Sequence, residues 1–306
     1  MIYFIVNKHS RSGKGAEIWK EIENRLKERQ ITYKAFATEY AGHARLLAIE
    51  ITQRKDEEIK LFVLGGDGTV NEAINGIVNF EKVKLGIIPT GSGNDLARGL
   101  GITKSPVEQL DALLDSEEEV LHDLGRVTWN QGADTRLFAI SSGIGMDAIV
   151  CKKALTSKLK KVLNKLHLGK LTYILITIHT LFSMRTADAT GEADGKALSF
   201  SKLIFTAAMN FKAEGGGVPM APRASATDGK LSVCSVHGIP KALTFFALPF
   251  LVAAKHEKLK GFEIVDCDRF QLNLSDPFVL HTDGEYCADV TDPVFCCEPA
   301  KIRIIV

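Results

Sequence analysis

The sequence predicts two domains: a doubly wound α/β domain with a mostly parallel sheet, followed by an antiparallel β-sandwich domain. Over residues 1–122, apolar strand-like runs alternate with amphipathic helical patterns, and glycine-rich turns join them. Over residues 123–299 the apolar runs become shorter and mostly strand-like. Asp-Gly pairs at 228–229 and 283–284 indicate tight turns between such strands.

The first domain is expected to contain four strands, each followed by a glycine-containing turn and a helix. The strands are 2–6, 31–38, 59–64 and 83–88, and the first helix carries Ile18, Trp19, Ile22 and Leu26 on one face. Later helices are expected around 44–52, through Val70, Ala73, Ile74 and Ile77, and through Leu96 and Ala97. Ligands of such sheets bind beyond the carboxyl ends of the strands, where three of the glycine-rich turns fall.

The second domain is expected to be an antiparallel β structure interrupted by a helical insert at 148–182. The boundary is placed in the acidic segment 116–123, and the last strand, 300–306, is free to return to the first domain. The expected strands lie within 136–142, 198–210, 229–236, 269–274, 278–282 and 301–306.

Composition narrows the function classes. The chain has 306 residues, 25% of them charged, with a formal net charge of +1, which argues against a nucleic-acid partner. The N-terminus lacks the pattern of a signal peptide, and the six cysteines form neither a CxxC pair nor a zinc spacing. We therefore expect a cytoplasmic protein with reduced thiols. The apolar runs 171–182 and 242–254 are too short to span a bilayer and are interpreted as buried helices or walls of a lipid pocket.

The loop GGDGT (65–69) is a candidate phosphate site. Gly65 and Gly66 can take positive φ and leave no Cβ in the way, and Thr69 stands three residues before Glu72, the spacing of a capping box. A helix N-terminus offers N–H groups and a positive dipole end to an anion. Asp67 would repel phosphate unless a divalent cation or a ribose hydroxyl intervenes, so it predicts one of the two. A plain tight turn is the alternative.

Two further loops strengthen this hypothesis. PTGSGND (89–95) repeats the design, with Ser92 and Asp95 at the same capping spacing. The loop after the first strand ends SGKG (12–15), which leaves Lys14 available to a phosphate, although it is not a Walker A motif. Three such loops at one sheet edge, one of them with an acid, favour a nucleotide site.

GGDGTVNEAINGI (65–77) followed by GIIPTGSGNDLARGLGI (86–102) resembles the diacylglycerol kinase catalytic domain, and within that superfamily the soluble bacterial lipid kinases of the YegS/BmrU type. The resemblance extends through SSGIGMDA (141–148), the segment 210–233 and HTDGE (281–285). NKHSRSGKG departs from the family's Asn-Pro-x-Ser-Gly turn because it lacks the proline and has extra residues.

The resemblance implies an NAD kinase/diacylglycerol kinase-like fold, ATP and Mg²⁺ as cofactors, and phosphoryl transfer to a lipid hydroxyl. It assigns Glu285 as proton acceptor and Asp283 to the catalytic centre. From the chemistry of the loops, Asp67 and Asp95 are expected to hold Mg²⁺ or the water around it, and Asp67 is counted among the catalytic residues. A structural Mg²⁺ site at Asp228 and the Lys230 carbonyl is doubtful, because Ser225 and Thr227 stand where acids are common. By the resemblance the nucleotide-binding residues would be Asn7, Ser12, Gly13, Thr38, Gly66, Asp67, Gly68, Thr69, Val70, Asn71, Glu72 and Thr90. The glycine loops themselves add Gly65, Gly91, Ser92, Gly93, Asn94 and Asp95.

The expected reaction is transfer of the γ-phosphate of ATP to diacylglycerol, giving phosphatidate. A lipid alcohol is a poor acid, so a carboxylate must accept its proton, and Glu285 is preferred over Asp283. The alternative for TDGE (282–285) is a plain hairpin turn with a solvated acid. Alternative functions are phosphorylation of another lipid alcohol (a sphingoid base or ceramide), an NAD kinase, and a nucleotide-binding regulator without catalysis.

A membrane contact is expected in the basic helical segment. Residues 148–186 contain eight Lys or Arg and no acid, and Lys152–Lys170 is the candidate contact with an anionic lipid surface. The alternative is a solvated helix packed on its own domain. This predicts peripheral association with the inner face of the membrane; a homodimer is left open.

Overall fold

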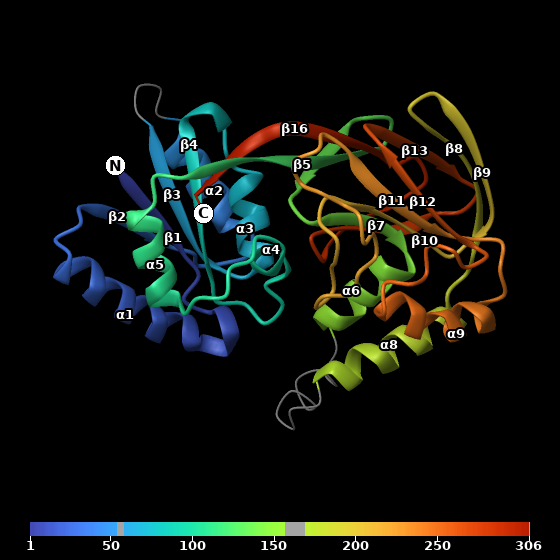
Figure 1. The fold of residues 1–306 in the computed structure, drawn as a ribbon, viewed down its shortest axis with the longest axis horizontal. Coiled ribbons are helices and arrows are strands. Elements are labelled where there is room, and N and C mark those ends of the chain that lie inside the picture. Colours follow the sequence, from blue (N-terminus) through green and yellow to red (C-terminus); the bar gives the residue numbers. More distant parts are fainter. Residues whose placement is uncertain (54–57, 157–168, 306) are drawn as a thin grey trace. The chain divides into compact units, whose positions relative to one another are not determined.

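The computed structural model describes residues 1–53, 58–156 and 169–305, which form two compact units. The first unit contains Met1–Leu124 and Glu298–Val306, and the second contains Gly125–Cys297. The first is an α/β structure and the second is built on antiparallel β-sheet (Figure 1), which confirms the predicted fold class. The strands β5 (Glu119–Trp129) and β16 (Val294–Ile305) each run from one unit into the other.

The sheet of the first unit is parallel, with the order β2-β1-β3-β4-β16. The chain first adds β2 on one side of β1 and then adds β3 on the other side. The connections after β1 and β3 therefore leave in opposite directions, which makes this point the topological switch point of the sheet. The strands are β1 (Ile2–Val6), β2 (Tyr33–Ala37), β3 (Ile59–Gly65) and β4 (Val83–Pro89).

Helices cover both faces of this sheet. Alternate strand residues such as Phe4 and Phe62 pack with Trp19, Ile22 and Leu110, so α1 and α5 share one face. On the other face α2 contacts β1 and α3 contacts β3. The helices are α1 (Lys14–Glu28), α2 (His43–Thr52), α3 (Asp67–Ile74), α4 (Asp95–Gly99) and α5 (Pro106–Asp115), with short 3-10 turns η1 (Ser10–Gly13) and η2 (Phe80–Lys82).

Two expectations for these helices need correction. The third helix was expected to reach Ile77, but α3 ends at Ile74, although Ile77 is still buried. The helix α5 was not predicted, although its start carries strong signals: Ser105 accepts from the Glu108 N–H, the Glu108 carboxylate accepts from the Ser105 N–H, and Pro106 is the first helical residue.

The second unit contains an antiparallel sheet with the order β12-β11-β10-β7-β14-β15, and β13, β8 and β9 pair beside β16. Two expected strands are each divided in two, because 136–142 covers the end of β6 and the start of β7, and 198–210 covers most of β9 and all of β10. The strands are β6 (Asp134–Phe138), β7 (Ser141–Gly145), β8 (Ala187–Ala193), β9 (Lys196–Leu203), β10 (Phe205–Met209), β11 (Leu231–Val236), β12 (Phe262–Cys267), β13 (Arg269–Leu274), β14 (Phe278–Thr282) and β15 (Glu285–Val290).

Three helices of the described residues lie in the second unit: α6 (Met146–Thr156), α8 (Gly169–Ser183) and α9 (Lys241–Val252). Figure 1 shows α8 and α9 next to each other, where the Phe182 and Phe245 rings lie 6.3 Å apart. Among the described residues, no helix is both long and apolar enough to cross a membrane. In its described residues the expected insert 148–182 thus contains most of α6 and α8, and residues 157–168 lie outside the described part.

Candidate active site

The candidate nucleotide site starts from side chains that join the ends of β1, β3 and β4. The Asn7 amide after β1 donates to the Thr69 hydroxyl in α3 at 2.9 Å. Ser10 and Thr90 hydroxyls, one after each of β1 and β4, lie 2.7 Å apart. Thr38, after β2, donates its backbone N–H to the Val6 carbonyl. The predicted residues Asn7, Thr69, Thr90 and Thr38 therefore do lie at the carboxyl edge of the sheet, around its switch point.

The two glycine loops touch through their backbones. A Cβ on Gly66 would stand 3.1 Å from the Gly91 Cα, and one on Gly91 would stand 2.7 Å from the Gly66 Cα. A Cβ on Gly65 would clash with the Thr69 side chain at 2.6 Å. Neither Gly65 nor Gly66 has a positive φ, and Gly66 is extended at φ −96°. These glycines are needed for close approach of backbones.

Asp67 holds the two loops together. Its carboxylate accepts backbone N–H groups from Asp95 at 3.0 Å and Leu96 at 3.1 Å, which are the first residues of α4. The expected cap by Ser92 is therefore wrong, because an acid from the neighbouring loop supplies the acceptor. The loop itself is closed by Asn94, which has φ +52° and exchanges hydrogen bonds with the backbone of Gly91. The predicted residues of both loops thus form one connected structure.

Glu72 faces away from the glycine loops. Its carboxylate oxygens accept the N–H groups of Gly42 at 2.8 Å and Ala44 at 3.2 Å, at the start of α2. The predicted capping box of α3 was therefore wrong, because Glu72 caps a different helix. Val70 and Asn71 are almost fully buried within α3. These three residues support the loop rather than extend its accessible surface. The Ser12 side chain lies outside the described part, while Gly13 has φ +99° before α1.

The space beside Gly93 suits a divalent cation. A Cβ on Gly93 would stand 3.2 Å from Asp67 Oδ2 and 3.8 Å from Asp95 Oδ2, so both carboxylates border the space that the glycine leaves open. Arg98 pairs with Asp95 and also donates to the Gly93 carbonyl at 2.9 Å. Oxygen donors of this kind suit Mg²⁺, so Asp67 and Asp95 fit the predicted metal site.

The second predicted metal site has weaker chemistry. Asp228 is exposed, and its carboxylate accepts the Lys230 N–H at 3.1 Å in a local turn. The hydroxyls of Ser225 and Thr227 lie 3.2 Å apart and face each other. One exposed carboxylate beside neutral hydroxyls gives little charge to hold a cation.

In the second unit, Asp283 has a largely structural environment. It is buried, has φ +47°, and follows β14 in the HTDGE turn. Its carboxylate accepts backbone N–H groups of Ala139, Ile140 and Ser141 at 2.8–3.0 Å. The Asp283 N–H in turn donates to the Ser141 carbonyl. Asp283 therefore fixes the HTDGE turn against the connection between β6 and β7.

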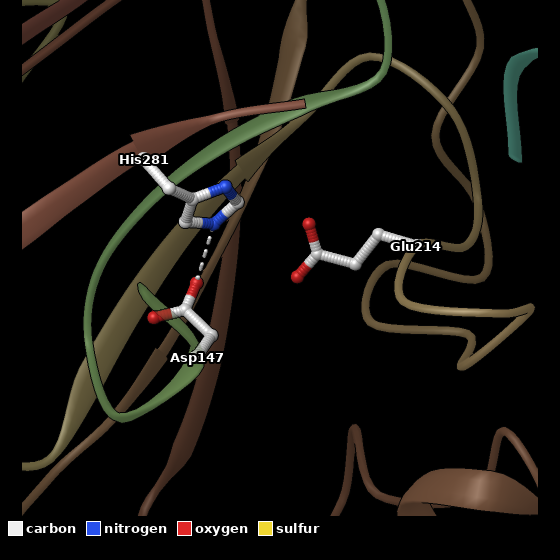
Figure 2. A group of neighbouring side chains, drawn as sticks. All are labelled: Asp147, Glu214 and His281. Atoms are coloured by element: carbon white, nitrogen blue, oxygen red, sulfur yellow. Dashed lines mark hydrogen bonds and ion pairs between the residues drawn. The ribbon is translucent and has the colours of Figure 1, made fainter. Parts of the chain in front are cut away.

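Glu285 begins β15 on the same turn, paired with Thr282, and it is only half-buried. Next to this turn is a buried group whose members the sequence did not bring together, although His281 stands within the HTDGE motif. His281 Nε2 lies 3.1 Å from Asp147 Oδ2, and Glu214 points toward both (Figure 2). Glu214 also accepts from the Ser141 hydroxyl. Gly143 leaves the room for this contact, since a Cβ there would stand 1.9 Å from the Asp147 carboxylate.

The surroundings of His281 shift its pKa upward. Burial alone lowers the pKa of the imidazole, but the hydrogen bond and charge of Asp147, then Glu214 and Asp283, outweigh it. The Gly284 N–H donates to Nδ1 at 3.2 Å, so the neutral ring carries its proton on Nε2, toward Asp147. Asp147, Glu214 and His281 form the one group of metal-type ligands found among the described residues. Asp147 and Glu214 were missed because each stands alone in its segment, with no acid or histidine at a ligand spacing.

The predicted membrane segment is described only in part. Lys152 lies 3.9 Å above the Tyr286 ring and 3.8 Å from Asp289, and Lys153 donates to the Thr180 hydroxyl at 3.2 Å. Both lysines thus contact their own unit. Lys158, Lys160, Lys161 and Lys165 lie outside the described residues.

Comparisons with known proteins agree along the whole chain. Residues 1–127 match the family "Diacylglycerol kinase catalytic domain", and residues 140–306 match "YegS C-terminal NAD kinase beta sandwich-like domain". A relative from Bacillus subtilis, named "Putative lipid kinase YtlR", is 29% identical over 99% of this chain and 98% of its own. A diacylglycerol kinase of the same organism is 28% identical over 89% of this chain and 86% of its own.

Solved structures show the same fold. A crystal structure from Bacillus anthracis, described as a "putative diacylglycerol kinase", has a TM-score of 0.76 at 21% identity and covers 99% of this chain and 94% of its own. At this identity the similarity establishes the fold alone.

Proposed function

We propose that this chain transfers the γ-phosphate of ATP to a lipid hydroxyl. The premise is that it belongs to the family that joins a diacylglycerol kinase catalytic domain to a YegS-type C-terminal domain. The preferred acceptor is diacylglycerol, which would give phosphatidate. This choice rests on the names of the relatives, several of which are diacylglycerol kinases. A sphingoid base or ceramide would use the same chemistry.

The observation that carries the proposal is the connection of the two glycine loops at the switch point of a parallel sheet. Gly66 and Gly91 touch, and Asp67 joins α3 to the start of α4. Backbone N–H groups in such a loop can hold phosphates without a side chain in the way. Because the loops are already fixed to each other, little ordering remains to be done when the nucleotide binds.

Asp67 and Asp95 are the residues that would hold the metal, beside Gly93. Mg²⁺ there would neutralise part of the negative charge on the phosphates. In the second unit, Glu285 is the proposed acceptor for the proton of the lipid hydroxyl. Its side chain is half-buried and begins β15, whereas the Asp283 carboxylate is bound to backbone N–H groups. His281 and Asp147 would position the turn that carries Glu285.

The reaction is tested by incubating the full chain with Mg²⁺ and labelled ATP, with lipid extract or NAD as acceptor. We expect label in a lipid, identified by mass spectrometry as phosphatidate, and no label in NADP. A different labelled lipid would replace diacylglycerol as the acceptor. Labelled NADP without labelled lipid would favour the NAD kinase alternative, and nucleotide binding without any product would favour the regulator.

The proposed location is the inner face of a membrane, because the acceptor is a lipid. Within Lys152–Lys170, only residues 157–168 stay candidates for the membrane contact, because Lys152 and Lys153 have partners in their own unit. Exchange of Lys160 and Lys161 for Glu should weaken binding to anionic vesicles. Unchanged binding would exclude this segment as the contact.

A further inference from the structure

The outward face of α9 is unusual for a helix on a protein surface, because every exposed residue from 242 to 254 is apolar. Leu243, Phe246 and Phe250 recur at helical spacing and are 48%, 67% and 47% exposed, and Val252 just beyond them is 66% exposed. We call the exposed row of Leu243, Phe246 and Phe250 the α9 face.

The opposite side of α9 is already used for packing. Thr244, Ala247 and Leu251 are buried, and Phe245 and Leu248 pack against the core of the second unit. The helix is therefore apolar on both sides, and the core accounts for only one of them. A usual surface helix has polar residues on its outer side, so the α9 face is expected to have an apolar partner.

The residues after the helix carry positive charge. Lys255, Lys258 and Lys260 are exposed, and the Lys255 N–H donates to the carbonyl of Phe250, directly beside the α9 face. The segment is anchored, because His256 is fully buried with Nε2 3.0 Å from the Met220 carbonyl. The acid of this segment, Glu257, pairs with Arg223. Lys255 is thus held beside the α9 face, and Lys258 and Lys260 are exposed on the same anchored segment.

We infer that the α9 face inserts into the surface of an anionic lipid membrane, with Lys255, Lys258 and Lys260 at the headgroups. Large apolar side chains flanked by cations fit the boundary between acyl chains and anionic headgroups. A protein partner would need an apolar surface and an acidic surface side by side. An anionic bilayer has both, because its acyl chains match the apolar side chains and its headgroups match the lysines. The inference does not depend on the proposed reaction.

The test is sedimentation of the full chain with vesicles of phosphatidylcholine alone or mixed with phosphatidylglycerol, without diacylglycerol or nucleotide. We expect binding to the mixed vesicles that weakens with added salt. The double variant Phe246→Ser/Phe250→Ser should bind them at least about tenfold more weakly. Lys258→Glu/Lys260→Glu should remove the preference for anionic vesicles.

The matched control is Val78→Ser, which removes another exposed apolar side chain, in the first unit and 60% exposed. It should bind vesicles like the unchanged protein, and circular dichroism should give all variants similar melting temperatures. Equal vesicle binding by Phe246→Ser/Phe250→Ser, or no binding by the unchanged protein, would overturn the inference. Conversion of a dimer to a monomer by that variant in light scattering would also overturn it, because a second copy would then cover the face. Since the vesicles contain no acceptor, a missing kinase reaction cannot be confused with missing binding.

Discussion

At the residue scale, the acids Asp283 and Glu285 lie on the same turn but have different surroundings. Asp283 is buried and accepts three backbone N–H groups, a carboxylate environment typical of a fixed turn. Glu285 is half-buried at the first position of β15. Proton transfer needs a carboxylate that can reach an incoming hydroxyl, so the surroundings favour Glu285 for this role.

Glu285→Gln should lower kcat about 10²-fold or more, because general base catalysis typically contributes ~10²–10⁴. The melting temperature should hardly change, since the amide has nearly the same shape. The measurement is lipid kinase turnover together with calorimetry. Asp283→Asn is the comparison: it places an amide against buried N–H groups and should cost at least about 2 kcal/mol of stability. Full turnover in Glu285→Gln would remove Glu285 from the mechanism.

Asp67→Asn should weaken nucleotide binding and destabilise the first unit. One amide oxygen can still accept, but the NH₂ group would face the N–H of Asp95 or Leu96. Loss of a charge-assisted bond costs about 1.5–3 kcal/mol. Urea unfolding and calorimetric titration with ATP measure both effects. Glu50→Gln, an exposed carboxylate on α2, is the control and should change neither quantity. An unchanged affinity for ATP in Asp67→Asn would contradict its place in the site.

Sequence patterns indicated the residues of the glycine loops but not their partners. Asp67 was expected beside a phosphate, and the structure adds that its carboxylate holds the start of α4. Asp147 and Glu214 escaped notice because they lie 134 and 67 positions before His281 in the chain and meet it only in the fold. Such contacts depend on strand order, which local spacing does not contain.

At the element scale, Glu72 connects two helices that the sequence treats separately. A capping box is a local pattern, but Glu72 satisfies the N–H groups of Gly42 and Ala44 because α2 and α3 pack against each other. Glu72→Ala should therefore destabilise the first unit by about 1 kcal/mol, the usual value of an N-terminal cap. Urea unfolding measures it, and Glu72→Gln, which keeps an acceptor, should lose less. A midpoint equal to that of the unchanged protein would show that α2 does not need this cap.

The pair α1 and α5 is joined by charge as well as by its apolar core. Asp111 accepts from Arg25 at 3.0 Å and from Arg29 at 2.9 Å. The hydrogen bond from Arg25, then that from Arg29, holds the pKa of Asp111 below its ordinary value of 3.8. A lowered folded-state pKa contributes stability above the unfolded pKa, and this contribution disappears as the pH falls through the folded value.

Asp111→Asn should therefore lower the melting temperature at pH 7. The difference in melting temperature from the unchanged protein should shrink as the pH falls below about 3.8. Melting curves of both proteins across this range give the difference directly. Asp276→Asn, an exposed acid of the second unit, serves as the control. A difference that is constant from pH 7 to the acid end would mean that the charge of Asp111 does not stabilise the helix pair.

Helix α9 shows what apolar content can and cannot predict. The run 242–254 was expected to be a buried helix or the wall of a lipid pocket. It does form a helix, but Phe246 and Phe250 face outward. The sequence could not predict this orientation, because a helix that is apolar on all sides gives no signal of which side packs against the core. The parallel strands of the first unit were predictable because burial on both faces gives them continuous apolar runs.

On the scale of the whole molecule, the two units have separate cores and separate candidate tasks. One core surrounds Phe4 and Phe62 in the α/β unit, and another surrounds Phe205 and Phe270 in the β unit. The glycine loops belong to the first, and HTDGE and the α9 face belong to the second. Only β5 and β16 carry the chain from one unit to the other within the described residues.

This division predicts two independent footprints in hydrogen exchange of the full chain. A non-hydrolysable ATP analogue with Mg²⁺ should slow exchange at residues 65–70 and 90–96, where backbone N–H groups would contact phosphates. Anionic vesicles without nucleotide should instead slow exchange at 242–255, because insertion removes the α9 face from water. If each unit binds its own ligand as proposed, each ligand should leave the exchange rates of the other region unchanged. Protection of α9 by nucleotide alone, or of the glycine loops by vesicles alone, would show that the two units respond as one and that the assignment of one task to each is wrong.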